Sequence, residues 1–246
     1  NVTHELKTPL AVMQAAGENL ADGRVDNKER LKAYGNHIHS ESIRLRKMIE
    51  KLLDVAKADT NQSLIEPKPV HLNRLLQKYI DEHADYVKEK GFTLETSIDD
   101  DLDLVMVDTD SFDTIIANLL ENAIKYSRDE KYIGISLEQK DSEIILKVKD
   151  HGMGIPKKSM KHIFEKFYRA EDVLTANTKG HGLGLSIVKN LVEQNGGEIA
   201  VRSEENSGSC FTIRFPVAHE EDIQQYHLSN PVEPDKLTQE SSEYVG

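Results

Sequence analysis

The sequence predicts an α+β protein with more than one domain, in which a helical hairpin that forms a dimeric four-helix bundle precedes an α/β sandwich. Over residues 1–60, apolar residues recur first every three or four positions and then every seven. Over residues 71–217, amphipathic helical stretches mix with short runs of alternating apolar and polar residues. Between the two patterns lies 61–70, which contains Pro67 and Pro69 and is interpreted as a linker.

Residues 1–60 are expected to form two helices separated by a break at Asp22-Gly23. The apolar stripe of the first helix consists of Leu6, Leu10, Met13, Gly17 and Leu20. That of the second repeats every seven residues, at Leu31, Ile38, Leu45 and Leu52. Two helices cannot bury both stripes alone. We therefore expect an antiparallel hairpin that pairs with a second copy, as a homodimer with a four-helix bundle.

The second domain is expected to contain both helices and strands. The predicted helices are 72–90, 111–127 and 183–196, and the predicted strands are 92–98, 104–108, 131–139, 143–150, 197–203 and 209–217. Strands 131–139 and 143–150 are expected to pair antiparallel. Helices and strands mixed around one sheet form an α/β sandwich. Residues 218–246 carry seven acidic residues and one lysine with few apolar residues, which predicts a disordered acidic tail.

Charge and cysteine content exclude several classes of protein. The net charge of −12 disfavours a nucleic-acid partner. Cys210 is the single cysteine, which excludes a disulfide framework and a cysteine-based zinc site, and favours a cytoplasmic location. No apolar run approaches the roughly 18 residues that cross a bilayer. Membrane attachment is therefore expected only through segments outside this chain.

The stretch NLLENAIKYS places two asparagines on one helix face. Asn118 and Asn122 are four residues apart, so their side chains point the same way, and Lys125 and Tyr126 follow one turn later. Two amide oxygens that face a cavity can hold a hard cation such as Mg²⁺, and Lys125 can add positive charge beside phosphates. The alternative is the polar side of an ordinary amphipathic helix.

The stretch DHGMGIP follows an apolar strand. Asp150 stands at the end of that strand, where its carboxylate could accept a hydrogen bond from the adenine amino group. Gly152 and Gly154 permit positive φ angles and close backbone approach. The alternative is a glycine turn between two elements.

The stretch GHGLGLSIVK is a glycine-rich loop that leads into a helix. Gly180, Gly182, Leu183 and Gly184 precede or open that helix, whose N-terminal N–H groups can bind phosphate. It is not a P-loop, because no Gly-Lys-Ser/Thr follows, and no strand leads directly into it as in a dinucleotide fingerprint. The polar segment 171–179 just before it is expected to act as a lid over nucleotide.

These three stretches, with NVTHELKTPL before them and IFEKFYRA between the last two, resemble the boxes of sensor histidine kinases of two-component systems. They match the family's phosphoacceptor, N, G1, F and G2 boxes in that order, and the resemblance covers roughly residues 1–217. It implies a HisKA-type dimerisation and phosphoacceptor hairpin. It further implies a GHKL, or Bergerat, ATP-binding domain of the HATPase type.

The resemblance implies a role for each matching residue. His4 would accept the γ-phosphoryl group of ATP, with Glu5 as the adjacent base or orienting group. Thr8 would position water when the kinase dephosphorylates its partner, the receiver domain of a response regulator. ATP and Mg²⁺ are the implied cofactors. The nucleotide-binding residues would be Asn118, Asn122, Lys125, Tyr126, Asp150, Gly152, Gly154, Gly180, Gly182, Leu183 and Gly184, with the two asparagines holding the metal.

Two other functions are weighed against a kinase. GHKL ATPases of chaperone, topoisomerase or mismatch-repair type use a glutamate one turn before the metal-binding asparagine to activate water. Asn118 occupies that position here, which favours transfer to a side chain over hydrolysis. A non-catalytic dimerising switch, or a phosphatase that acts through Glu5 and Thr8, is the third interpretation.

Overall fold

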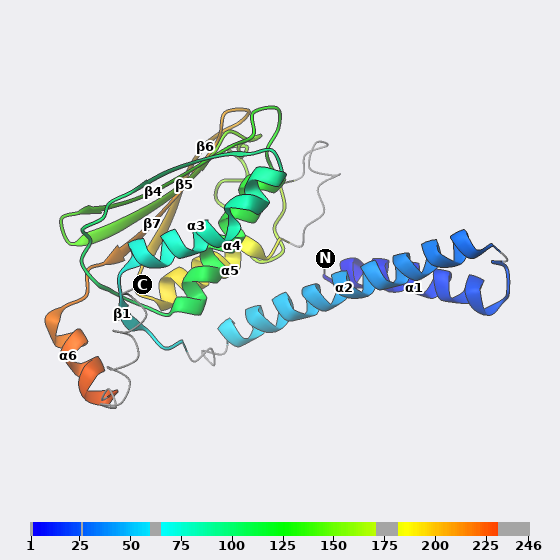
Figure 1. Cartoon of the computed structure of the whole chain (residues 1–246), viewed down its shortest axis with the longest axis horizontal. Helices are drawn as coiled ribbons and strands as arrows, with labels where there is room; N and C mark the ends of the chain where they lie inside the picture. Colours follow the sequence, from blue (N-terminus) through cyan, green and yellow to red (C-terminus); the bar gives the residue numbers. More distant parts are fainter. Residues whose placement is uncertain (1, 26, 60–64, 171–181, 231–246) are drawn as a thin grey trace, which may run out of the picture.

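The computed structural model describes residues 2–25, 27–59, 65–170 and 182–230. Within the first helices, the side chains of residues 2–5, 47 and 50–59 are outside the description. Figure 1 shows a long helical hairpin followed by a layered domain in which helices cover a sheet. This is the predicted architecture.

The hairpin consists of α1 (Val2–Ala21) and α2 (Lys28–Asp59), which run antiparallel (Figure 1). The connection follows the predicted break: Gly23 adopts a φ of 66°, and Asn27 Oδ1 caps α2 by accepting from Glu29 N at 2.7 Å. Ala16 and Met48 are buried. Leu10 and Leu31, both members of the predicted stripes, remain 54% and 55% exposed. A single hairpin therefore leaves apolar surface uncovered. None of the helices in the described ranges is long and apolar enough to cross a membrane.

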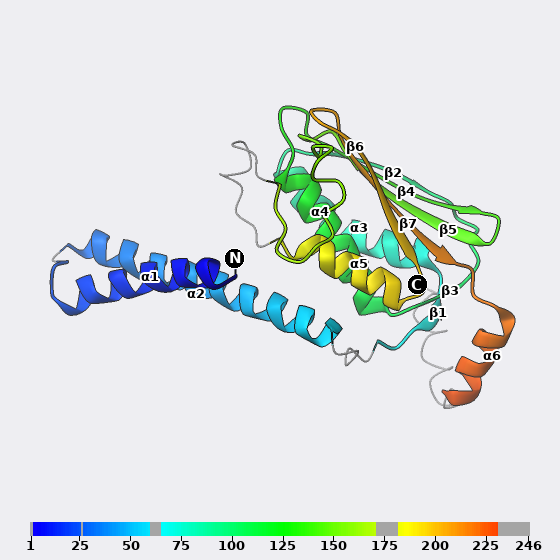
Figure 2. The ribbon, with the colours of Figure 1, turned by 180° about the vertical axis from the view of Figure 1, so that it is seen from behind.

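The main sheet has five strands in the order β2-β4-β5-β7-β6. These strands are β2 (Thr93–Ile98), β4 (Tyr132–Lys140), β5 (Glu143–Asp150), β7 (Gly208–Pro216) and β6 (Glu198–Glu204). β2 pairs parallel with β4 and the other neighbours pair antiparallel, so the predicted pairing of 131–139 with 143–150 is confirmed. In Figure 2 the helices α3 (Leu72–Glu89), α4 (Thr109–Lys125) and α5 (Gly184–Gln194) cover one face of this sheet.

The core lies between the sheet and these three helices. From α4 come Phe112, Ile115 and Ile116, which are fully buried against inward-facing strand residues such as Ile144 and Phe215. Burying a side chain of this size contributes about 1.5–3 kcal/mol. α4 and α5, which carry two of the predicted site motifs, are therefore held by their apolar faces, and their polar faces are fixed in position.

The predicted linker is wrong over its last three residues. Lys68–Val70 forms strand β1, which pairs antiparallel with β3 (Val105–Val107) in a separate two-stranded sheet. Pro69 is compatible with a strand here because each strand of a two-stranded sheet is an edge, where a missing N–H costs little. The predicted strand 104–108 is confirmed as β3, but it lies outside the main sheet.

The predicted disordered tail is also wrong over its first part. Glu220–Ser229 forms helix α6, which packs near β1. Glu220, Glu221 and Asp222 lie in its first turn and His227 in its last. Acidic residues at the N-terminus of a helix stabilise it through the helix dipole, so the charge that predicted disorder here supports a helix. The rest of the predicted tail, 231–246, lies outside the described residues.

Candidate functional site

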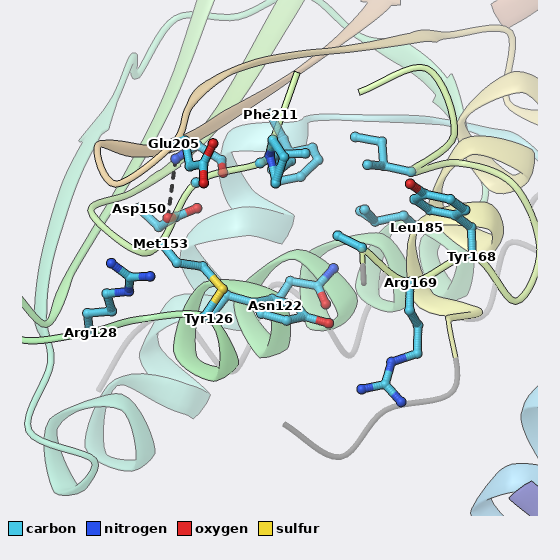
Figure 3. A pocket seen from close by; sticks show the side chains of 16 residues that line it. Asn122, Tyr126, Arg128, Asp150, Met153, Tyr168, Arg169, Leu185, Glu205 and Phe211 are labelled. Carbon is cyan, nitrogen blue, oxygen red and sulfur yellow. Dashed lines mark hydrogen bonds between the residues drawn. The ribbon is translucent and has the colours of Figure 1, made fainter. Parts of the chain in front are cut away.

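One pocket brings the predicted motifs together. It lies between the C-terminal end of α4, the loop after β5, the β6–β7 turn and the start of α5 (Figure 3). Four of the residues that the sequence predicts to bind nucleotide line it: Asn122, Tyr126, Asp150 and Gly154. Its apolar walls come mainly from Met153, Ile155, Pro156, Ile163, Leu185 and Phe211. A mostly apolar cavity with a few converging polar groups suits a flat heterocyclic ligand.

Asp150 is held at the end of β5 by backbone donors. Its Oδ1 accepts hydrogen bonds from Gly152 N at 2.8 Å and from Ser209 N at 3.2 Å, and the residue is only 8% exposed. Ser209 stands opposite Asp150 in the β5–β7 register. Because Oδ1 is committed to the backbone, Oδ2 is the oxygen left to accept from a bound group. Burial raises the pKa of Asp150, although the two backbone N–H groups act in the opposite direction.

Replacing Asp150 with asparagine should stabilise the fold at neutral pH. A raised pKa in the folded state means that ionising Asp150 costs stability, and this cost appears as the pH rises above the ordinary value of about 4. Asparagine keeps the Oδ1 acceptor and carries no charge. The stability of Asp150→Asn relative to the native chain should therefore increase from pH 4 to pH 7, as measured by urea denaturation. A stability difference between the variant and the native chain that shrinks from pH 4 to pH 7 would contradict a raised pKa of Asp150 in the folded state.

The glycine loop after β5 is shaped by close backbone contacts. A methyl group at Gly152 would lie 2.4 Å from Tyr126 O. At Gly154, which has a φ of 68°, a methyl group would lie 2.0 Å from Glu204 O. Any side chain at either position would push the loop away from α4 or from the β6–β7 turn. The loop therefore forms the pocket wall through its backbone.

Asn118 and Asn122 lie beside the start of α5. Asn118 is 8% exposed, and its Nδ2 donates to Thr114 O at 2.8 Å. The other end of this amide faces α5, since a methyl group at Gly184 would lie 3.0 Å from Asn118 Oδ1 and 4.0 Å from Asn122 Nδ2. An oxygen ligand is thus presented where the N–H groups of the first turn of α5 have no partner within the helix. Oxygen ligands next to a helix N-terminus suit a cation with bound phosphates.

The loop before α5 is tied to the segment that resembles the F box. Gly182 has a φ of 67°, and its carbonyl accepts from Phe167 N at 2.8 Å. A methyl group at Gly182 would lie 2.7 Å from Phe167 C and from Tyr168 O. Leu183 is buried and packs with Ile187, so it anchors the helix rather than facing the pocket. Gly180 and the lid predicted for 171–179 lie outside the described residues.

Several predicted residues are not among those that line this pocket. Asn118, Gly152, Gly182, Leu183 and Gly184 lie on the elements around it without lining it. Lys125 does not line it; its Nζ donates to Tyr126 Oη at 3.1 Å and lies 4.7 Å from the centre of the Tyr126 ring. His4 and Glu5 belong to α1, and their side chains are outside the described residues. Thr8 follows one turn later and is exposed.

Sequence reasoning missed several residues that line the pocket. Arg128, Glu205, Ser209 and Phe211 do so from segments outside the motifs. The position of Ser209 depends on the β5–β7 register, and that of Glu205 on how the β6–β7 turn folds back. Neither position leaves a local signal in the sequence.

The fold and the pocket together define an ATP-binding domain joined to a helical hairpin. Residues 107–219 match the family described as "Histidine kinase-, DNA gyrase B-, and HSP90-like ATPase", and residues 1–61 match "His Kinase A (phospho-acceptor) domain". The chain belongs to the sensor histidine kinases of two-component systems, as the five boxes predicted.

Individual relatives agree with this family. Sensor protein SrrB of Staphylococcus aureus is 31% identical over 216 residues, which cover 88% of this chain and 37% of that protein. The chain thus spans little more than a third of this relative. Two solved structures share the fold: histidine kinase ThkA in complex with response regulator protein TrrA, and full-length ShkA in complex with AMPPNP. ThkA has a TM-score of 0.69 at 23% identity, over 88% of this chain and 60% of that one. ShkA has a TM-score of 0.66 at 23% identity, over 87% of this chain and 45% of that one.

Proposed function

We propose that this chain is the catalytic part of a histidine kinase, which transfers the γ-phosphoryl group of ATP to His4 and then to an aspartate on a response regulator. The observation that carries the proposal is the convergence of Asp150, Asn122 and the start of α5 on one pocket. ShkA in complex with AMPPNP and ThkA in complex with a response regulator support it. Residues 1–60 would be the phosphotransfer hairpin, and the ATP-binding domain would begin at β1 and extend to residue 217.

The adenine ring is proposed to bind between the apolar walls, with its amino group donating to Asp150 Oδ2. Met153, Ile155 and Phe211 supply apolar surface on the pocket walls. With Oδ1 fixed by Gly152 and Ser209, the carboxylate cannot easily rotate away from the base. A guanine base presents a carbonyl oxygen where adenine has its amino group, and that oxygen would be repelled by the carboxylate.

The phosphates are proposed to lie at the N-terminal end of α5, next to Asn118 and Asn122. These two side chains would hold Mg²⁺ through their amide oxygens, and the metal would neutralise charge on the phosphates. The backbone N–H groups at the start of α5 would bind phosphate oxygens directly. Gly184 fits this role because a larger residue would crowd Asn118 Oδ1.

His4 is proposed to act as the nucleophile. An unperturbed imidazole is mostly neutral near pH 7, so one ring nitrogen can attack the γ-phosphorus. The nitrogen–phosphorus bond forms as the bond to the bridging oxygen of the departing ADP breaks. The ring proton passes to Glu5, which also holds the imidazole in its orientation. Pro9 lies inside α1 and cannot donate to the carbonyl of Glu5, so the helix can bend where the ATP-binding domain must approach.

The chain is also proposed to act as a homodimer through the hairpin. Leu10, Val12, Leu31 and Ile49 are exposed on α1 and α2, although the helices already pack against each other. Covering this surface with a second hairpin would complete a four-helix bundle.

Phosphotransfer tests the proposal. The chain is first phosphorylated with γ-labelled ATP and Mg²⁺, then mixed with a panel of purified receiver domains. Label should leave the chain and appear on at least one receiver, and should be absent when that receiver's acceptor aspartate is replaced by alanine. Transfer to none of the receivers, with the chain fully labelled and stable, would contradict the role of a response regulator as partner.

A further inference from the structure

Three loops meet along one side of the nucleotide pocket. They are the segment after α4 (126–131), the glycine loop after β5 (151–156) and the β6–β7 turn (205–207). Tyr126 O accepts from Met153 N at 3.0 Å, and Met153 O accepts from Asn206 N at 2.7 Å. These bonds link the three loops in sequence through their backbones.

A side-chain hydrogen bond between the first and third loops completes a closed ring of hydrogen bonds among the three loops. Arg128 Nη1 donates to Asn206 Oδ1 at 2.6 Å and so joins the first loop directly to the third. Asn206 adopts a φ of 65°, which turns its backbone N–H toward Met153 while its side chain reaches Arg128. Asparagine tolerates this left-handed conformation better than most residues.

This ring of hydrogen bonds lies at the end of the pocket where Asp150 is located. Arg128 and Glu205 both line the cavity, and Figure 3 shows them near Asp150, with Tyr168 and Leu185 at the opposite end. The β6–β7 turn runs directly into Gly208 and Ser209, and Ser209 N is one of the two donors that hold Asp150 Oδ1. Movement of the turn would therefore loosen the carboxylate that faces the base.

We propose that Arg128 is a positioning residue that clasps the β6–β7 turn onto the adenine end of the pocket and thereby raises both affinity for ATP and discrimination against GTP. This inference rests on the proposed function, because it requires that the pocket binds ATP. Arg128 acts through Asn206 and the turn, rather than on the phosphoryl group. Removing the clasp should therefore raise the ATP concentration that gives half-maximal phosphorylation.

A double-mutant cycle on the full chain tests this clasp. Asn206→Gly removes the side chain and keeps the positive φ without strain, and Arg128→Ala removes the donor. Each variant should weaken ATP binding by about fivefold to tenfold, as expected for loss of one charge-assisted hydrogen bond. The double variant should bind no more weakly than either single one, because both remove the same contact. Arg128→Lys should recover part of the loss.

The ratio of ATP to GTP affinity separates a clasp from a general loss of stability. It should fall in Arg128→Ala and Asn206→Gly and stay at the native value in Arg74→Ala, which removes an exposed arginine on α3, away from the pocket. Native affinity in both single variants, additive losses in the double variant, or an unchanged base preference would overturn the clasp. Failure of the native chain itself to bind ATP would instead refute the proposed function on which the clasp rests.

Discussion

Replacing Asn122 with alanine should reduce phosphorylation of the chain by ATP at least about a hundredfold, while the hairpin still pairs with a second copy. Asn122 lines the pocket beside the start of α5, where the phosphates are proposed to lie. Its amide oxygen is one of two proposed Mg²⁺ ligands from α4. Loss of a group that stabilises charge in the transition state typically costs a hundredfold to a thousandfold in rate.

Two quantities are measured. The initial rate of label incorporation from γ-labelled ATP reports phosphorylation, and the molar mass of the chain in solution reports dimerisation. Glu121→Ala provides the control, because Glu121 is the neighbouring residue on α4, is exposed and does not line the pocket. It should retain both phosphorylation and dimerisation. A near-native rate for Asn122→Ala would refute the proposed metal ligand.

Replacing Gly182 with alanine should lower affinity for ATP more than tenfold. Alanine would have to adopt a φ of 67°, which costs about 1–2 kcal/mol. Its methyl group would also lie 2.7 Å from backbone atoms of Phe167 and Tyr168. The loop would have to move, which would break the bond from Phe167 N to Gly182 O and displace the start of α5, where the phosphates are proposed to bind.

Gly196→Ala is the matched control for this effect. Gly196 has a similar φ of 72°, but a methyl group there would have no atom within 4 Å. The Gly196→Ala variant should lose about as much stability from backbone strain as Gly182→Ala does, and it should keep native affinity for ATP. Titration with a fluorescent ATP analogue and thermal unfolding distinguish the two variants. Equal affinities would show that the contact between Gly182 and the segment at Phe167 does not shape the nucleotide site.

Elements with a strong local pattern could be predicted from the sequence. The apolar face of α4 is continuous from Phe112 to Ala123, and Asp108 caps the helix by accepting from Ser111 N at 2.7 Å. β4 is long, places Ile133, Ile135 and Leu137 at alternate positions, and is joined to β5 by a two-residue turn. By contrast, β1 and β3 have three residues each and pair across a long stretch of sequence, so neither carries a periodicity that reveals its partner.

The candidate site, like the fold, has a part that could be predicted from the sequence and a part that could not. Asn122, Tyr126 and Asp150 were predicted because each belongs to a short motif whose residue types suggest a chemistry, and all three line one pocket. Arg128 and Asn206 could not be predicted to meet, because they are 78 residues apart and their contact depends on the β6–β7 turn folding back over the glycine loop. Lys125 has the residue type expected beside phosphates, but its Nζ contacts Tyr126 instead. Spacing along a helix fixes a face, while the neighbours on that face are set by tertiary packing.

The central proposal is that His4 accepts phosphate from ATP bound in this pocket. The most direct test incubates the purified chain, beside a His4→Gln variant, with Mg²⁺ and γ-labelled ATP, and follows the stability of the label in acid and alkali. We predict a label on the native chain that is labile in acid, stable in alkali and absent from His4→Gln. Label that persists in the variant, or phosphate released from ATP without labelling either chain, would contradict the assignment of His4 and favour an ATPase.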